Sequence, residues 1–422
     1  SEHEFEIVPV AQKIKTLERR AEQFDEMIVK VRRADLIVWA TPVYYFLVPA
    51  QLKRFIELIF ERDTAEAFIA KQAAAITTSI HFFDHTAHNY LTGISEDLGM
   101  VYRGGHSAGM NDLKKEWGQR QIEHFAARVF DAAAAGKAAS VSTIRIDSDR
   151  IDYRPGPGPA SVSQGERRVL VLSDQGEGSE NLNRMIKRVV NSFAEPVEVV
   201  NLADLDLRGY CQGCLQCGFD NQCLYEGRDG FTDFFRNTVM KADIIFFAGS
   251  IRDRYLSARW KMFFDRSFFR GHVPSLTGKQ LAWVISGPLR QLPNLRQILE
   301  AYTEFQDASL TGMVSDEYGR SETIDELLDA LISRSLEDDR AGTRLPVSFF
   351  GVGGKKLLRD AVYGELRFIF QADHRSYQRH SRYDFPQRRI GLRLLNSAAP
   401  LLRLPSIRRR FVPRIREGMV RP

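Results

Sequence analysis

The sequence predicts an α/β protein with two tandem domains, each a doubly wound parallel sheet covered by helices, and a basic C-terminal extension. Three observations predict this fold class: an internal repeat at a constant offset, short apolar strands alternating with amphipathic helices, and a change of composition between and after the two copies. With 422 residues, 44% of them hydrophobic, the chain is long enough for two or three domains with sizeable cores.

The repeat appears when the chain is compared with itself. Residues 34–40 (Ala-Asp-Leu-Ile-Val-Trp-Ala) match residues 242–248 (Ala-Asp-Ile-Ile-Phe-Phe-Ala) at an offset of 208. The same offset pairs Lys53, Phe55, Glu57, Lys71 and Gln72 with Lys261, Phe263, Asp265, Lys279 and Gln280. A constant offset without gaps indicates a duplicated domain rather than a solenoid.

Each copy shows the same succession of elements. Strands are expected at Leu36–Ala40 and Ala73–Thr78 in copy one and at Ile244–Ala248 and Leu281–Ser286 in copy two, with a closing helix near Trp117–Ala135. Continuous apolar strands separated by helices are typical of a parallel sheet buried on both faces. Ligands are then expected at the carboxyl ends of the strands.

The two copies differ at their starts. Copy two opens with a strand over 167–172, whereas copy one begins at a strand-like Phe5–Val10 that corresponds to Val197–Asn201, the second strand of copy two. Copy one is therefore expected to lack its first strand and helix, either because the natural chain is longer or because this copy is truncated. The predicted units are a domain at 1–145, a Pro- and Gly-rich extended linker at 146–166, a domain at 167–345 and an extension at 346–422. Within the extension, one more strand is expected at Val347–Gly351 and a helix at Leu358–Phe370.

Charge and hydropathy exclude some classes. No apolar stretch is long enough to span a bilayer, and the acidic start is unlike a secretory signal, so a cytoplasmic protein is expected. The net charge of +5 belongs to the tail, because Arg388–Pro422 holds ten arginines and one acidic residue. Leucines mixed with arginines fit a membrane surface, an acidic partner or simple solvation, and no nucleic-acid-binding fold is recognisable.

All four cysteines lie within thirteen residues, in the pattern CxxCxxCx5C: Cys211, Cys214, Cys217 and Cys223. Thiolates at this spacing on a turning backbone can converge on one small volume, which predicts a single soft-metal site in a reducing compartment. An iron–sulfur cluster is favoured, because four-thiolate zinc sites usually separate their cysteine pairs by a longer interval. Structural zinc and free thiols are the alternatives.

Three further segments carry candidate chemistry. The polar loop Ser173–Leu182 joins a strand to a helix, where a phosphate would sit, although an ordinary polar turn is the alternative. The segment Thr41–Tyr45 ends a strand with tyrosines that suit a flat aromatic cofactor or packing at a sheet edge. His81, His85 and His88 fit a metal site, a redox or nicotinamide-side role, or loop packing.

Residues 34–44, followed by Ala50–Phe55, resemble the NAD(P)H-dependent FMN reductase and iron–sulfur flavoprotein group, which has a flavodoxin-like fold. The compact cysteine motif after the second strand of copy two adds to this resemblance, which covers roughly residues 1–135 and 167–345. The resemblance implies FMN and a [4Fe-4S] cluster as cofactors, with NAD(P)H or a redox partner as the electron source. It also implies an oxidoreductase that exchanges electrons with a partner protein.

Carried over residue by residue, the resemblance divides the cofactor sites between the copies. Flavin-ring contacts would come from Thr41, Pro42, Val43 and Tyr44, phosphate contacts from Ser173, Ser179 and Asn181, and cluster ligands from Cys211, Cys214, Cys217 and Cys223. FMN in copy one is favoured over copy two, where Gly249–Arg254 places charges beside the expected flavin.

The resemblance also bears on assembly. Family members look like dimers in which the cluster of one subunit approaches the flavin of another, so this tandem is expected to be a covalent pseudo-dimer, with a homo-oligomer as a further expectation. The alternative is a non-catalytic or electron-relay subunit of a larger redox complex, with a decayed flavin site or structural zinc.

Overall fold

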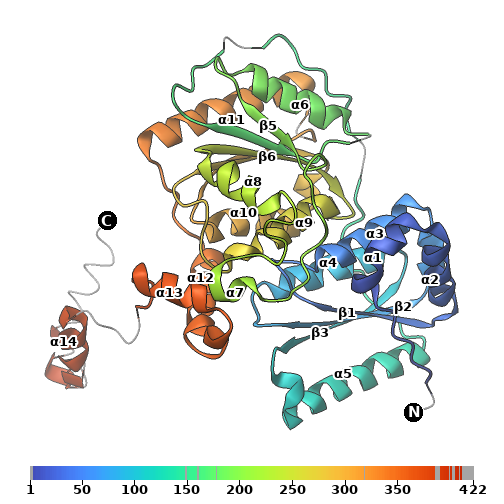
Figure 1. Cartoon of the computed structure of the whole chain (residues 1–422). Helices are drawn as coiled ribbons and strands as arrows, with labels where there is room; N and C mark the ends of the chain where they lie inside the picture. Colours follow the sequence, from blue (N-terminus) through green and yellow to red (C-terminus); the bar gives the residue numbers. More distant parts are fainter. Residues whose placement is uncertain are drawn as a thin grey trace. The chain divides into compact units, whose positions relative to one another are not determined.

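The computed structural model describes residues 3–147, 150–158, 161–176, 178–317, 319–384, 390–398, 400–401, 404–407 and 409–410. The chain forms two compact units, 1–373 and 374–422, and each is described by itself. The larger unit contains both sheet domains (Figure 1). In the described part of the chain, no helix is long and apolar enough to cross a membrane.

The first domain is a three-stranded parallel sheet in the order β1-β2-β3. Its strands are β1 (Leu36–Pro42), β2 (Gln72–Ser79) and β3 (Val101–Gly109). Its helices are α1 (Val10–Arg19), α2 (Ala21–Arg33), α3 (Ala50–Glu61), α4 (Asp84–Asp97) and α5 (Glu116–Ala134). Helix α5 covers one face of the sheet, and α3 and α4 lie on the other (Figure 1).

The second domain has the strand order β5-β4-β6-β8-β9, with the short β7 antiparallel to β6. The strands are β4 (Val169–Ser173), β5 (Glu198–Asn201), β6 (Ile244–Arg252), β7 (Tyr255–Leu256), β8 (Gln280–Ser286) and β9 (Ser309–Ser315). The helices are α6 (Glu180–Asn191), α7 (Cys217–Asp220), α8 (Phe231–Asn237), α9 (Ala258–Ser267), α10 (Pro293–Phe305) and α11 (Ser321–Ala341). A parallel order of second, first, third, fourth and fifth strand is flavodoxin-like, which confirms the predicted fold class.

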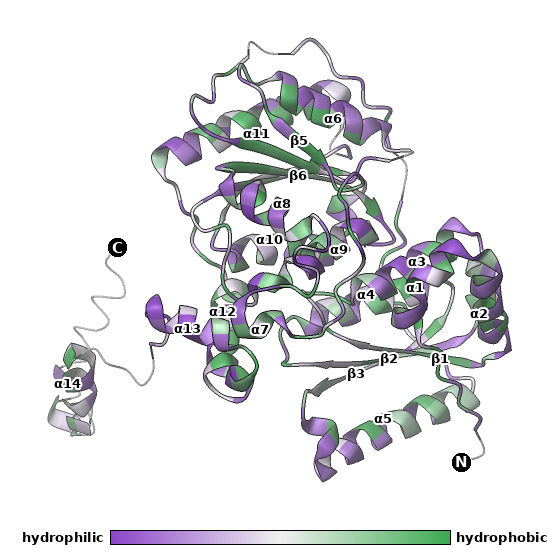
Figure 2. Cartoon of the chain, viewed as in Figure 1, coloured by the Kyte–Doolittle hydropathy of each residue, from purple (hydrophilic) through white to green (hydrophobic). Residues whose placement is uncertain are grey.

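The central strands of the second domain are apolar along their length, as the sequence predicts for a sheet covered on both faces (Figure 2). Every residue of β8 is buried, and large aromatic side chains such as Trp283 and Trp260 pack on one face of this sheet. The carboxyl ends of these strands form the edge at which a ligand is expected.

The repeat persists in three dimensions at the offset found in the sequence. Strands β1, β2 and β3 correspond to β6, β8 and β9, and the pair Gln72↔Val101 has its counterpart in Gln280↔Ser309. Each copy also has the same left-handed turn after its first shared strand, with φ values of 48° and 68° at Tyr45 and Phe46 and of 46° and 62° at Asp253 and Arg254. The duplication is therefore confirmed by backbone conformation as well as by sequence.

The expected strand at Phe5–Val10 is wrong. Residues 3–9 form no regular element, Phe5 and Ile7 are 69% and 90% exposed, and α1 begins at Val10. The alternating pattern lacks a neighbouring strand to supply hydrogen bonds, because the described residues of the first domain contain no counterpart of β4. This segment instead lies against α5, where the His3 ring stacks on Phe130 at 4.5 Å.

The expected strand at Val347–Gly351 is also wrong, because α12 (Phe349–Tyr363) begins there. Gly351 allows α12 to approach α10 closely, since a Cβ at this position would lie 2.1 Å from Glu304 Oε2. The expected helix at Leu358–Phe370 is interrupted at Gly364, after which a 3-10 helix, η6 (Glu365–Phe368), follows. Residues 346–373 pack within the larger unit.

The smaller unit contains most of α13 (Gln371–Arg379), which straddles the boundary, and all of α14 (Ile390–Ala398). The part of the expected arginine tail beyond residue 410 lies outside the described residues, as do residues 385–389.

The two domains pack through α3 and α9 with approximate twofold symmetry. Lys53 Nζ donates to the carbonyl oxygen of Arg252 at 3.1 Å, and its counterpart Lys261 donates to that of Tyr44 at 2.9 Å. Residues 44 and 252 are themselves separated by the repeat offset. Each domain therefore offers the other the same two groups, a lysine and a backbone carbonyl oxygen. An interface of this kind is isologous, as in a twofold dimer.

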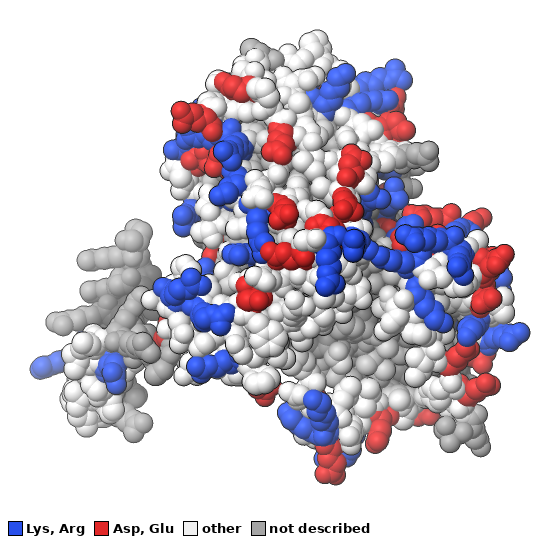
Figure 3. All heavy atoms as spheres, viewed as in Figure 1, with Lys and Arg blue, Asp and Glu red and all other residues white. Residues whose placement is uncertain are grey.

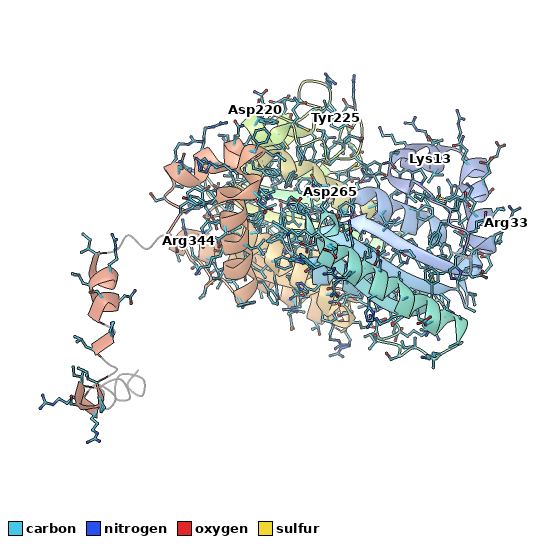
Figure 4. All side chains as sticks on the ribbon, turned by 90° about the horizontal axis from the view of Figure 1, so that it is seen from below. Lys13, Arg33, Asp220, Tyr225, Asp265 and Arg344 are labelled. Atoms are coloured by element: carbon cyan, nitrogen blue, oxygen red, sulfur yellow. The ribbon has the colours of Figure 1, made fainter. Side chains whose placement is uncertain are left out.

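Carboxylates at this interface complete the symmetry. Glu57 accepts a hydrogen bond from the backbone N–H of Ala258, the first residue of α9, and Asp265 accepts one from Ala50, the first residue of α3. Each acid also pairs with the lysine four residues before it. Asp265 is 1% exposed and lies where the two domains meet (Figure 4). The tandem chain is thus a covalent pseudo-dimer in its packing.

Candidate functional site

The cysteine loop follows β5 and precedes α8. All four thiols line one hollow with about 380 Å³ free of atoms, part of it open to solvent. Cys214 is exposed and the other three are half-buried, and none forms a disulfide. Positive φ angles at Gly213, Leu215 and Asn221 turn the backbone so that the thiols face the same hollow.

The walls of this hollow are mostly apolar and come from both domains. They include Leu215, Leu224, Phe268 and Phe269 of the second domain and Tyr44 of the first. Arg266 also borders the hollow, but its guanidinium is buried and forms two hydrogen bonds of 2.9 Å to Asp229. Among the residues that the structure describes, no Asp or Glu borders the hollow. The donor set there is thiol sulfur, which suits iron–sulfur clusters and zinc rather than hard cations.

The electrostatics of the loop keep its buried thiols protonated unless a metal binds them. Burial, together with the nearby Cys211, Cys223 and Cys214, raises the pKa of Cys217 to about 12. Burial also raises the pKa of Cys211. Four thiolates therefore cannot coexist here without positive charge, which a metal centre supplies because it deprotonates its thiol ligands. In this structure, no three Cys, His, Asp or Glu side chains of the described residues lie close enough around a common point to hold a metal ion.

The C-terminal part of the larger unit closes one side of the cysteine loop. A Cβ on Gly218 in α7 would lie 2.7 Å from the carbonyl oxygen of Ile369. Phe370 packs on Phe268, at a ring separation of 5.9 Å, and on His272 at 4.7 Å. Asp220 and Tyr225 lie toward the periphery of this region (Figure 4), where the Tyr225 ring covers the guanidinium of Arg266 at 4.3 Å.

The first domain reaches the cysteine loop through the segment after β1. The hydroxyl of Tyr44 lies 3.1 Å from Cys211 Sγ, and Gln51 Nε2 donates to the carbonyl oxygen of Cys211 at 2.8 Å. Burial and the neighbouring Cys211 raise the pKa of Tyr44 well above its usual value, so this phenol stays protonated and can donate to sulfur. Lys261, which donates to the carbonyl oxygen of Tyr44, fixes the segment from the second domain.

The other predicted flavin-ring residues lie at the carboxyl end of β1. Thr41 and Val43 are half-buried, Pro42 is exposed, and the Thr41 hydroxyl donates to the carbonyl oxygen of Pro42 at 3.1 Å. In the sheet, Thr41 aligns with Thr77 of β2, which in turn aligns with Ser107 of β3. A row of hydroxyl residues therefore crosses this edge of the sheet beside the predicted flavin segment, and their role in binding flavin stays a prediction.

The predicted phosphate residues lie at the edge of the second domain. Ser173 ends β4, and its buried hydroxyl has no hydrogen-bond partner among the described residues. Ser179 is buried at the start of α6, and its side chain does not cap that helix. Asp174 lies in the same loop, and burial raises the pKa of its carboxyl group. Glu177 of this loop lies outside the described residues, and phosphate binding here stays a prediction.

Asn181, the third predicted phosphate residue, contacts the segment between the domains. Its Nδ2 donates to the carbonyl oxygen of Ile151 at 2.8 Å and to Asp316 at 2.9 Å, and its Oδ1 accepts from the backbone N–H of Tyr153 at 3.0 Å. Both the nitrogen and the oxygen of the Asn181 carboxamide therefore already have hydrogen-bond partners.

The described residues between 144 and 156 form a strap across the carboxyl edge of the second sheet. The strap contacts the loop after β6, the end of β8 and the loop after it, helix α6 and the start of α11. These contacts are made through Arg254, Ser286, Gln291, Asn181, Arg184 and Ser321. Tyr153 is fully buried and donates to Asp325 at 2.6 Å. The sequence indicates only an extended spacer here, and Tyr153 within the Pro- and Gly-rich stretch is the one signal of a packed segment.

The histidine segment does not form a metal site. His81 hydrogen-bonds to Asp84 at 2.9 Å, and Asp84 also accepts from Ser107 at 2.6 Å. His88 points elsewhere and hydrogen-bonds to Thr77 at 2.8 Å. His81 and His88 thus bond to different polar partners, and the His85 ring packs near Phe83 with a ring separation of 5.5 Å. The segment is a set of separate contacts near the β2 and β3 edge rather than a convergent ligand set.

Part of this chain is similar in sequence to known proteins. Residues 1–112 match the family described as NADPH-dependent FMN reductase. An iron-sulfur flavoprotein of Archaeoglobus fulgidus is 32% identical over 104 residues, which are 25% of this chain and 45% of that protein. The match thus spans less than half of the relative.

Solved structures are similar at low identity. RosB with a bound 8-demethyl-8-formylriboflavin-5'-phosphate intermediate has 13% identity and a TM-score of 0.32, over 42% of this chain and 79% of that one. An FMN-dependent NADH-azoreductase from Bacillus anthracis in complex with FMN has 12% identity and a TM-score of 0.30, over 42% and 100%. The family match over residues 1–112 and the Archaeoglobus relative confirm the resemblance to FMN reductases and iron–sulfur flavoproteins seen in the sequence.

Proposed function

We propose that this protein is an oxidoreductase that uses FMN and a [4Fe-4S] cluster, with NAD(P)H or a redox partner as the electron source. The observation that carries the proposal is the contact between Tyr44 and Cys211, at 3.1 Å. This contact brings the segment expected to border a flavin in one domain against the thiols expected to hold a cluster in the other. The family match over residues 1–112 supports the flavin part, and the Archaeoglobus relative supports the cluster part.

When bound, FMN supplies hydride exchange with a nicotinamide and the cluster supplies single-electron transfer. The chain's own residues provide binding, shielding and tuning. Cys211, Cys214, Cys217 and Cys223 would ligate the cluster. The Tyr44 phenol donates a hydrogen bond to Cys211 once that sulfur is a thiolate, and hydrogen bonds to ligand sulfur help set the reduction potential of a cluster. Phe268 and Leu215 keep water from one side of the hollow.

We place the FMN beside the first domain. In the second domain the strap runs over the loops where a flavodoxin-like sheet binds its ligand, and the Asn181 carboxamide is engaged by the strap itself. The segment Thr41–Tyr44 has no such cover from the strap and ends next to the cysteine loop. One FMN per chain is therefore expected, with its ring toward the contact between the domains.

Cofactor analysis of protein purified without oxygen tests the proposal. About four irons and one FMN per chain are expected. NADPH should bleach the flavin absorbance if the protein accepts hydride directly. Protein that contains neither iron nor flavin after anaerobic purification would contradict the proposal.

Two substitutions decide which copy binds the flavin. Thr41→Val removes a hydroxyl at the edge of the first domain, and Ser179→Ala removes a hydroxyl at the start of α6 that caps nothing. Thr41→Val should weaken FMN binding measured by fluorescence titration, by about tenfold for one lost hydrogen bond of about 1.4 kcal/mol. Ser179→Ala should leave it unchanged. The reverse result would move the FMN to the second domain.

A second candidate is an electron-relay or non-catalytic subunit of a larger redox assembly. It is favoured by the first domain, whose described residues contain no loop equivalent to Ser173–Leu182 for a flavin phosphate. In that case the cysteines would hold either a cluster that receives electrons from a partner or one zinc ion. A brown, flavin-free protein that NADPH does not reduce would support the relay, and a colourless protein with one zinc would support a structural site.

A further inference from the structure

Helix α12 has two different faces. One face packs on the sheet domains: a Cβ on Gly354 would lie 2.7 Å from the ring of Phe82, and Leu358 is 1% exposed. The opposite face carries Phe349, Val352 and Tyr363, which are 83%, 43% and 46% exposed. Positions three and four apart along a helix share a face, so this apolar stripe lies away from the core.

Phe368, in the 3-10 helix that follows, is a further exposed aromatic residue, with 82% of its side chain in solvent. We call Phe349, Val352, Tyr363 and Phe368 the aromatic face. Single exposed apolar residues are ordinary on a protein surface. Two phenylalanines more than four-fifths exposed within twenty residues are not, and they indicate a surface with a partner.

The charges beside the aromatic face are mainly basic. Lys356 lies on the exposed side of α12, and Arg367 is adjacent to Phe368. Two acids also lie here and both have partners: Asp360 pairs with Arg359 at 2.7 Å, and Glu365 accepts from Asn111 at 3.1 Å. The face therefore presents aromatic rings with exposed cations close by in the sequence.

The smaller unit has the same composition. In α14, Ile390 and Leu394 are 73% and 65% exposed, and the one charged residue of the helix is Arg393. Leu401 and Leu404 beyond it are also about half exposed, and they are followed by exposed Arg409 and Arg410. On the face of the molecule shown in Figure 3, by contrast, acidic and basic side chains are interspersed over the two sheet domains.

We propose that the C-terminal part of the chain, from Phe349 onward, binds the surface of an anionic lipid bilayer. Aromatic side chains favour the headgroup level of a bilayer, and exposed leucines insert shallowly beside them. Lysine and arginine then meet the phosphates of acidic lipids. The exposed Lys356 and Arg367 near the aromatic face in the sequence, and the exposed Arg393, Arg409 and Arg410 of the smaller unit, supply complementary charge. Since no described helix can cross a membrane, this contact is with the surface.

Vesicle sedimentation of the full-length protein tests the proposal. Vesicles of phosphatidylcholine alone are compared with vesicles that contain 30% phosphatidylglycerol. Binding to the anionic vesicles should be at least tenfold tighter, and it should weaken in 0.5 M NaCl because salt screens the attraction. Equal binding to both vesicle types, or no binding to either, would overturn the proposal.

Matched variants separate the aromatic and charge contributions. The double variant Phe349→Ser/Phe368→Ser should weaken binding to anionic vesicles at least tenfold, whereas the control Phe5→Ser removes an aromatic ring that is 69% exposed on the first domain and should change nothing. Neutralising Arg393, Arg409 and Arg410 to Gln should weaken the preference for anionic lipid, because three of the ten arginines of Arg388–Pro422 are removed. Neutralising three exposed cations of the first domain, Lys13, Arg33 and Lys137, should preserve it.

All of these positions are exposed, so the variants should fold, and circular dichroism checks this. Vesicle binding that survives both the aromatic and the charge variants would overturn the proposal. Sedimentation velocity tests the alternative that a second copy of the chain covers the aromatic face. A dimer that Phe349→Ser/Phe368→Ser converts to monomer would support that alternative and contradict a lipid partner.

Discussion

The two domains share a backbone and an interface, yet they differ at nearly every position where a cofactor would bind. The paired strands, the left-handed turn and the buried lysines recur at one offset. The cysteine loop belongs to the second domain alone. At the corresponding offset the first domain has residues 3–15, which comprise an irregular segment and the first part of α1. The interface has kept its symmetry while the sheet edges diverged, which indicates that packing and chemistry were constrained separately after duplication.

The largest expected effect comes from removing the feature that distinguishes the copies. Cys217→Ser removes one of the four thiols that line the hollow. The cluster should be lost, and iron content measured by mass spectrometry should fall from about four per chain to below one, because a cluster held by four cysteines depends on all of them. Gln216→Ser, exposed in the same loop, is the control and should keep its iron.

The next effect compares the two buried lysines. Lys261→Met leaves Asp265 buried with no cation, so the free energy of unfolding should fall by about 3–5 kcal/mol. Lys53→Met should cost less, about 1–3 kcal/mol, because Glu57 retains an ion pair with Arg54 at 3.0 Å. The position equivalent to Arg54 in the second domain is Met262. Urea unfolding of both variants checks the order, and equal costs would show that Arg54 does not compensate.

A third effect concerns the contact that closes the cysteine loop. Gly218→Ala would place a methyl group against the carbonyl oxygen of Ile369, which should destabilise the protein by about 1–3 kcal/mol in thermal or urea unfolding. Gly353→Ala is the matched control in α12, where a Cβ meets nothing within 4 Å. It should be neutral or stabilising by about 0.5–1 kcal/mol, because alanine favours a helix over glycine. Similar losses in both variants would contradict close packing at Gly218.

The smallest effect is a difference in pH dependence between the two symmetric acids. Burial raises the pKa of Asp265 to about 6, with Lys261 only partly offsetting it. Burial would also raise the pKa of Glu57, but Lys53 and Arg54 outweigh it and hold this pKa below its usual value. A raised pKa means that the folded state holds the proton more tightly, so the Asp265 contribution to stability falls as pH rises toward 6. The Glu57 contribution is present above its unfolded pKa and is lost as pH falls below that value.

Urea unfolding between pH 4 and 7 tests these opposite signs. The stability difference between the native protein and Asp265→Asn should shrink or reverse as pH rises. The difference between the native protein and Glu57→Gln should grow over the lower part of the same range. Parallel slopes for the two variants would show that the two sites are electrostatically equivalent.

Much of the fold could be predicted from the sequence because the matched segments of the two copies share one offset without gaps. Residues 34–40 and 242–248 do form corresponding strands, and the helix expected near Trp117–Ala135 is α5. The strands predicted at Phe5–Val10 and Val347–Gly351 do not form, because a short alternating or β-branched run becomes a strand only where a neighbouring strand can pair with it.

The candidate site could be predicted only in part. Cysteine spacing predicts a shared hollow, which the structure contains. The Tyr44–Cys211 contact and the strap over Asn181 depend on how two domains and a linker meet in space, and sequence periodicity carries no information about such long-range packing. Lys53 and Lys261 were visible as matched residues, but their burial at the interface follows only from the symmetry of the folded pair.

The most direct test of the account is the simultaneous determination of iron, acid-labile sulfide, zinc and FMN in one anaerobic preparation of the full chain. The account predicts about four irons, about four sulfides and one FMN per chain, without stoichiometric zinc. One zinc per chain with no flavin, or thiols free of any metal, would contradict it.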